Sequence, residues 1–143
     1  MRVRAIAKKL SGEQRDAIGG TLVRAPLGAP LGAEYLVLGL VFSFNSRRLG
    51  TGVWVIHQDE AGNGVMLPLA LFEVIDARCS RHWEFRQQSD ESATLLPSAL
   101  YKPNLFEDAA DGAPAERSQL AATRALLEEE ERLLRAESPL RKS

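Results

Sequence analysis

Residues 34–85 decide the fold. EYLVLGLVFSF (34–44) is followed by a turn, by GTGVWVIHQDEAGNGVMLPLALFEVID (50–76), by a second turn and by HWEF (82–85). Short apolar runs separated by glycine-rich or charged turns are typical of a compact antiparallel sheet or small barrel. These runs contain no strong catalytic motif. The segment therefore predicts a small fold that presents a surface.

Residues 35–44 show the clearest strand pattern, because apolar side chains alternate along them and Gly39 would permit a sharp bend or bulge. Further strands are predicted over residues 2–8, 53–57, 65–67, 71–75 and 82–85, and Pro68 should end its strand or lie at a sheet edge. The predicted sheet buries the large apolar residues Leu38, Leu40, Phe42, Trp54, Ile56, Phe72 and Trp83.

Two helices are expected outside the sheet. Ser11 begins a capping-box pattern with Gln14 and predicts a short helix to about Ile18, followed by a loop over 19–33 to which the sequence assigns no role. After an irregular connection with short helical turns over 87–114, a long helix is predicted over 115–137, with Pro114 in its first turn and Ser138-Pro139 at its end.

The long helix carries leucines at every seventh residue, namely Leu120, Leu127 and Leu134, flanked by Leu126 and Leu133. This stripe predicts a face docked on the core, because two heptads are too few to indicate a coiled coil. The acidic run Glu128–Glu131 is interpreted as a solvated face, with Glu128–Arg132 and Glu131–Arg135 as i,i+4 pairs. A partner-binding acidic face is the alternative.

Length and composition indicate one domain over residues 1–143, with α+β content. The 18 Lys+Arg and 19 Asp+Glu nearly balance, so the whole chain generates no strong field toward nucleic acid or anionic lipid. The single cysteine, Cys79, cannot form an internal disulfide and is interpreted as a buried spare thiol. No apolar run approaches the length of a membrane span or a secretory signal, so we expect a cytoplasmic protein.

Candidate chemistry is sparse, and we expect no catalytic, cofactor-binding or metal-binding residues. His57, His82 and Cys79 have no metal-ligand spacing, and a Cys79–His82 nucleophile and base pair would be poorly oriented at the entrance of a strand. Asp59 and Glu60 are interpreted as turn formers, because adjacent carboxylates on a turn point apart. The glycine-rich turns match no phosphate or dinucleotide motif.

Nucleic-acid binding is an alternative. Four arginines in predicted turns could contact a phosphate backbone, while Trp54, Trp83 and Phe42 could provide stacking faces. The arginines are Arg47, Arg48, Arg78 and Arg81. A structural role is the stronger interpretation, because the aromatic residues fall at strand positions with apolar neighbours.

Residues 34–86 resemble a group of small bacterial proteins, among them immunity proteins found beside secreted polymorphic toxins. The resemblance rests on EYLVLGLVF, the DEAGNG turn, VMLPLALFEVID and HWEF. It implies a strongly bent antiparallel sheet or small Src-homology-3-like barrel, with a short N-terminal and a long C-terminal helix. It also implies a protein that binds and blocks a toxin, but it carries over no functional residue.

The leading hypothesis is therefore a non-enzymatic immunity protein that occludes the active site of a cognate toxin. The alternatives are a nucleic-acid or ribosome-associated small barrel, an adaptor in a larger assembly, and an enzyme of unrecognised type. Because nuclease toxins often present basic clefts, exposed carboxylates are the candidate partner-binding residues. These are Asp59, Glu60, Asp90, Glu91, Glu107 and Asp108. Charge reversal at Asp59/Glu60 or Glu107/Asp108 is expected to weaken binding more than reversal at Arg47/Arg48.

Overall fold

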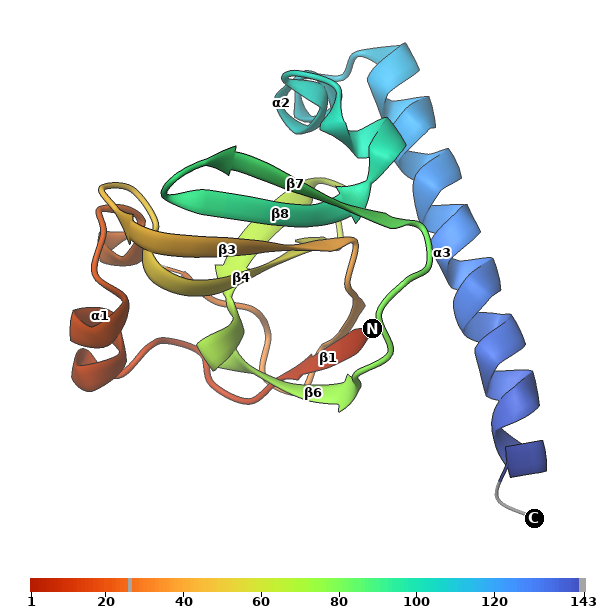
Figure 1. Ribbon diagram of the computed structural model, residues 1–143, viewed down its shortest axis with the longest axis horizontal. Coiled ribbons are helices and arrows are strands. Elements are labelled where there is room, and N and C mark those ends of the chain that lie inside the picture. The colour runs from red at the N-terminus through yellow and green to blue at the C-terminus, as the bar shows by residue number, and fades with distance from the viewer. Residues whose placement is uncertain (26, 142–143) are drawn as a thin grey trace.

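The computed structural model describes residues 1–25 and 27–141, with side chains as far as Glu137. It has an α+β fold of two antiparallel sheets with a long C-terminal helix beside them (Figure 1). The three-stranded sheet has the order β2-β1-β6 and the five-stranded sheet the order β5-β4-β3-β8-β7. The predicted α+β class is confirmed, but the strands belong to two sheets and not to one.

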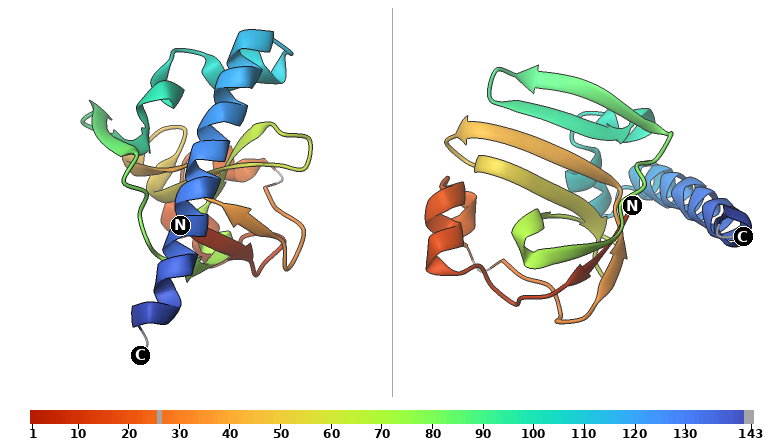
Figure 2. Two further views of the ribbon diagram at one scale, coloured as in Figure 1. Left: turned by 90° about the vertical axis from the view of Figure 1, so that its right-hand side faces the viewer. Right: turned by 60° about the horizontal axis from the view of Figure 1, so that its bottom comes forward.

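The three-stranded sheet places β1 (Arg2–Ala5) between β2 (Glu34–Leu36) and β6 (Phe72–Asp76). The five-stranded sheet contains β3 (Gly39–Ser46), β4 (Gly50–Gln58), β5 (Gly64–Pro68), β7 (Trp83–Ser89) and β8 (Ser92–Pro97). Figure 2 (right) shows the two sheets curving toward each other, with the main core between them. Pro68 ends β5, an outer strand, as its missing N–H predicts.

The single strand predicted over residues 35–44 is divided between the two sheets. The Val37 N–H donates to the carbonyl oxygen of Met1, whereas the Leu38 N–H donates to that of Ile56, so the chain changes sheet at these residues. Gly39 follows directly and lies so close to β8 that a Cβ would clash with the carbonyl oxygen of Leu95. The sequence pattern does not reveal this break, because the residues before and after it are all apolar.

The N-terminal helix forms as predicted. α1 (Gly12–Ile18) begins with a complete capping box, in which the Gln14 N–H donates to Ser11 Oγ and the Ser11 N–H donates to Gln14 Oε1. The short 3-10 helix η1 (Leu22–Arg24) follows. Backbone N–H groups of Thr21 and Leu22 donate to the carbonyl oxygens of Arg47 and Arg48, which attaches this segment to the β3–β4 turn.

The prediction of an irregular connection over residues 87–114 is wrong in its first part. β7 continues to Ser89 and β8 occupies Ser92–Pro97, in the middle of the sheet beside β3. The polar sequence hid the hairpin, because β7 is an outer strand with mostly exposed side chains. The remainder contains the expected short helices, η3 (Ser98–Tyr101) and α2 (Leu105–Ala110).

The long helix α3 (Pro114–Arg141) begins at Pro114 as predicted and extends beyond its predicted end. Leu120 and Leu127 are buried against Leu38, Ile56 and Leu96, so the leucine stripe does dock on the core. Leu126 and Leu133 are exposed. No helix in the described part of the chain combines the length and apolar character needed to cross a membrane.

The acidic run on α3 is not a uniform solvated face. Glu131 pairs with Arg2 of β1, and Glu130 accepts a hydrogen bond from the Arg81 N–H in the β6–β7 loop. Both side chains are largely covered. The predicted Glu131–Arg135 pair is present at 3.6 Å, but Glu128 pairs with Arg124 where Arg132 was expected. Glu131 therefore attaches α3 to the three-stranded sheet, and Glu130 attaches it to the β6–β7 loop.

Candidate partner-binding surface

The two sheets leave one flank open. β6 and β7 are outer strands, and no pairing joins them among the described residues. The loop over 77–82 connects them, and Figure 1 shows β7 and β6 on opposite sides of β8, β3 and β4. The inner face of the five-stranded sheet continues along β3 and β7 past the residues that pack in the main core, because Phe42, Phe44 and Phe85 on these strands are exposed.

Three phenylalanines occupy this uncovered continuation. Phe42 lies opposite Ala93, whereas Leu40 lies opposite Leu95, which in turn lies opposite Phe85. Directly opposite residues share a face, as do residues two apart on a strand, so Phe42, Phe44 and Phe85 lie on the same face as buried Leu40. Their exposed fractions are 37%, 69% and 62%. We call these three residues the aromatic face.

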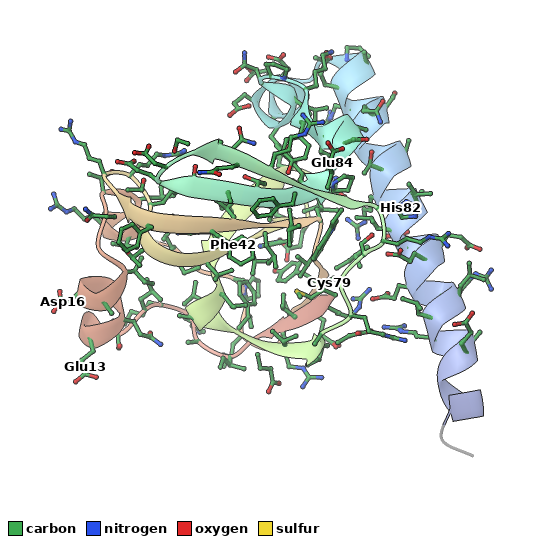
Figure 3. The ribbon with its side chains drawn as sticks, in the orientation of Figure 1. Glu13, Asp16, Phe42, Cys79, His82 and Glu84 are labelled. Carbon is green, nitrogen blue, oxygen red and sulfur yellow. The ribbon has the colours of Figure 1, made fainter. Side chains whose placement is uncertain are left out.

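The exposure of Phe42 corrects the predicted core. Of the seven large residues expected to be buried, five are: Leu38, Leu40, Trp54, Ile56 and Phe72. Trp83 is half-buried, with an indole N–H that has no partner among the described residues. Figure 3 shows Phe42 on β3, between β8 and β4. Large apolar side chains exposed together on one sheet face are characteristic of interaction sites.

The β7–β8 turn adds charge at the edge of the aromatic face. Asp90 and Glu91 form the turn, and with Phe42, Phe44 and Gln87 they line a shallow hollow of about 230 Å³. The Phe44 N–H donates to the carbonyl oxygen of Glu91, which fixes the turn against β3. Within the described chain neither carboxylate makes an ion pair or side-chain hydrogen bond. We call Asp90 and Glu91 the acidic hairpin.

Asp59 and Glu60, also predicted partner-binding residues, are committed to internal contacts. Asp59 Oδ1 accepts the N–H groups of Ala61 and Asn63 and so holds the β4–β5 turn together. Glu60 accepts a hydrogen bond from the Tyr35 hydroxyl, and burial together with this carboxylate raises the pKa of Tyr35. The structure therefore gives Asp59 the turn-forming role that its sequence context indicated.

Glu107 and Asp108 lie in the first turn of α2. The ring of Phe106 covers Gly64, so this end of α2 lies against the start of β5, beyond the β4–β5 turn. Two of the three predicted acidic pairs are thus neighbours. The acidic hairpin is separate from them and is the pair that adjoins the aromatic face.

The four arginines of the nucleic-acid alternative do not form one surface. Arg78 pairs with Asp76 and donates to the carbonyl oxygen of Leu134, and Arg81 pairs with Glu130. Arg47 and Arg48 lie at the opposite end, beside η1. Trp54 is fully buried and cannot stack on a base. The predicted combination of arginines and stacking aromatics is therefore not assembled.

The structure places the two histidines and the cysteine in different surroundings. Cys79 is exposed, which corrects the predicted buried thiol. His82 Nε2 lies 3.9 Å from Glu130 of α3, and His57 is buried between Tyr35 and Phe72. No group of three or more metal-ligating side chains occurs among the described residues.

Sequence reasoning missed Phe44 and Phe85 as surface residues. Both occur in runs with strand alternation, and alternation alone cannot tell a face that packs on another layer from one that remains open. The only signal was the interruption of apolar character by Ser43, Asn45 and Arg86 around them.

Comparisons with protein-family models, with curated proteins and with solved structures found no match for the chain. The resemblance to immunity proteins accordingly stays a prediction from residues 34–86.

Proposed function

We propose that this chain is a non-enzymatic protein-binding module whose partner surface consists of the aromatic face and the acidic hairpin. The observation that carries the proposal is the exposure of Phe42, Phe44 and Phe85 on one sheet face, with two unpaired carboxylates at its edge. Aromatic residues dominate the binding energy of protein interfaces, and charged groups at the rim mainly steer association. This surface combines both.

The proposed partner is a bacterial toxin that the protein neutralises by occlusion in the cytoplasm of the producing cell. The toxin assignment rests on the resemblance of residues 34–86. The acidic hairpin supports a partner with a basic surface, as on enzymes that act on nucleic acid, because opposite charges accelerate encounter. Asp59, Glu60, Glu107 and Asp108 would contribute at longer range from the far end of the five-stranded sheet.

The finer fold assignment belongs to the same proposal. We infer that the two sheets are an open variant of a strongly bent, Src-homology-3-like barrel, in which β6 and β7 would be the neighbouring strands at the point of closure. The sharp change of sheet at Val37 and Leu38 supports this view, because small barrels turn corners at such breaks.

Affinity capture followed by a toxicity assay tests the function. Tagged wild-type protein and a Phe42→Ser/Phe44→Ser variant are each used to capture partners from the producing cells under stringent washing. The captured protein is then expressed in a host with and without this chain. The proposal expects growth arrest that wild type relieves and the variant does not. A harmless captured protein, or equal capture by the variant, would refute it.

A further inference from the structure

A second hollow lies beside α1 and η1, at the end of the molecule that also carries the β3–β4 turn (Figure 1). It has a volume of about 450 Å³ and is bounded by α1, by η1 and by residues 8–10, 25 and 27–28. Four cationic side chains line it, namely Lys8, Lys9, Arg15 and Arg24, and no carboxylate is among the lining residues. We call these four residues and the hollow between them the basic cleft.

The basic cleft has an apolar floor. Leu10 and Val23 contribute to it and are only 5% and 6% exposed, because their side chains also belong to the main core. A volume of several hundred cubic ångströms with a mainly apolar lining and a few converging polar groups is characteristic of small-molecule sites. The cleft is therefore suited to a ligand with an anionic part and a less polar body.

The four cations of the cleft differ from most others in the molecule in having no carboxylate partner in the described chain. Arg2, Arg4, Arg78, Arg81, Arg86, Lys102, Arg124, Arg132 and Arg135 all form ion pairs. Among the other cations whose side chains the structure describes, Arg47, Arg48 and Arg117 also lack one. Glu13 and Asp16 share α1 with Arg15 but do not line the cleft, and Figure 3 shows them on the outer side of that helix. The four positive charges are thus not neutralised by carboxylates of the described chain and could pair with an anionic ligand.

The walls of the cleft are held by contacts that exist without a ligand. Gly28 lies so close to Lys8 that a Cβ at residue 28 would clash with the Lys8 carbonyl oxygen. The capping box fixes the start of α1, and the bonds from Thr21 and Leu22 to the β3–β4 turn fix η1. A preformed site loses less freedom on binding than a flexible one, which favours affinity.

We propose that the basic cleft binds a small phosphorylated molecule with at least two negative charges. Guanidinium groups bind phosphate oxygens through paired hydrogen bonds, and the two lysines add compact charges. A polynucleotide fits less well, because no aromatic residue that could stack on a base is among the described residues that line the cleft. The cleft shares no lining residue with the hollow beside the aromatic face, and its proposed ligand does not depend on the proposed protein partner.

Calorimetric titration tests this inference, with pyrophosphate and ADP as probes at low and physiological salt. Wild type should show saturable binding of one equivalent. Arg15→Gln/Arg24→Gln should weaken it by about tenfold or more, because charged hydrogen bonds are lost. The matched control, Arg47→Gln/Arg48→Gln, removes two nearby unpaired cations outside the cleft and should weaken binding by less than about threefold, since surface charge is screened.

Three outcomes would overturn the inference. The first is that neither probe shows saturable binding. The second is that the two double variants lose the same amount of affinity for the probe. The third is that a single-stranded oligonucleotide binds more tightly than the probes and depends on Arg47 and Arg48 as much as on Arg15 and Arg24. The last would assign the basic end to nucleic acid. All substituted side chains are exposed, so each variant should melt at a temperature close to that of wild type. Measuring this temperature is the control that each variant is folded.

Discussion

Arg2 and Glu131, separated by 129 residues in the chain, form a two-point ion pair. Arg2 Nε donates to Glu131 Oε2 at 2.9 Å and Nη2 donates to Oε1 at 2.8 Å. The side chains are 23% and 11% exposed, so the pair is shielded on both partners. The Arg2 guanidinium holds the pKa of Glu131 below its usual range. This contact joins α3 to the central strand of the three-stranded sheet.

Glu131→Gln should destabilise the protein by about 1–3 kcal/mol, the usual contribution of a hydrogen bond to a charged group that is partly buried. The matched control is Glu129→Gln on the same helix. Its partner Arg132 is 65% exposed, so the loss should be much smaller than that of Glu131→Gln, because solvent screens an exposed pair. Urea unfolding measures both. Equal losses would show that the Arg2–Glu131 pair does not anchor the helix.

Truncation of a core phenylalanine should destabilise the protein much more than truncation of a phenylalanine on the aromatic face. Phe72 is 6% exposed, and Phe72→Ala should cost about 3–5 kcal/mol, a large share of the stability of a small domain. Phe44 is 69% exposed, and Phe44→Ala should cost less than about 1 kcal/mol. Chemical denaturation of both variants is the measurement. A large loss in Phe44→Ala would mean that this side chain supports the fold.

Stability should fall as the pH drops below about 6.5 because of His57. Burial lowers the pKa of this side chain in the folded protein below its ordinary value of 6.5. The unfolded chain then binds a proton that the folded chain does not, so this contribution is complete above pH 6.5 and is lost as the pH falls toward the folded-state pKa. His57 Nδ1 lies 3.1 Å from the Gln58 carbonyl oxygen, and Nε2 has no partner in the described structure.

Free energies of unfolding measured between pH 5 and 8 check this. His57→Phe should remove the slope near pH 6, although the variant can differ in absolute stability. His82→Gln should retain it. A slope unchanged by His57→Phe would assign the pH dependence to another group.

Partner association should depend most on the acidic hairpin. Asp90→Lys/Glu91→Lys should slow association, and the effect should diminish with salt because the carboxylates act by steering. Glu107→Lys/Asp108→Lys should have a smaller effect, and Arg47→Glu/Arg48→Glu the smallest. Asp59 is unsuitable for this comparison because its reversal would break the β4–β5 turn. Association rates across the series are the measurement, and a larger loss from the arginine variant would indicate an acidic partner or nucleic acid.

The sequence predicted local structure well where one signal acted alone. The Ser11 capping box, Pro114 at the start of α3 and Pro68 at the end of β5 each follow from the chemistry of single residues. It failed where the arrangement of layers decides the outcome. Val37 and Leu38 are apolar like their neighbours, yet hydrogen bonds to two different sheets divide the strand there.

The candidate site shows the same division. The sequence predicts Asp90 and Glu91 as exposed carboxylates on an irregular polar connection. Their position in a turn beside Phe42 and Phe44 depends on β8, which the polar sequence concealed. The exposure of the phenylalanines depends on how far the three-stranded sheet extends below them. Neither property is encoded in local periodicity.

The central claim is that the aromatic face binds the partner, and the dissociation constant of the Phe42→Ser/Phe44→Ser variant for the captured protein tests it most directly. The matched control is Leu126→Ser/Leu133→Ser, which removes two leucines on α3 that are 47% and 44% exposed. Truncation of aromatic anchors typically costs 2 kcal/mol or more, so binding should weaken by about 30-fold or more, whereas the control should bind as wild type. Wild-type affinity in the phenylalanine variant, or an equal loss in the leucine control, would contradict the account.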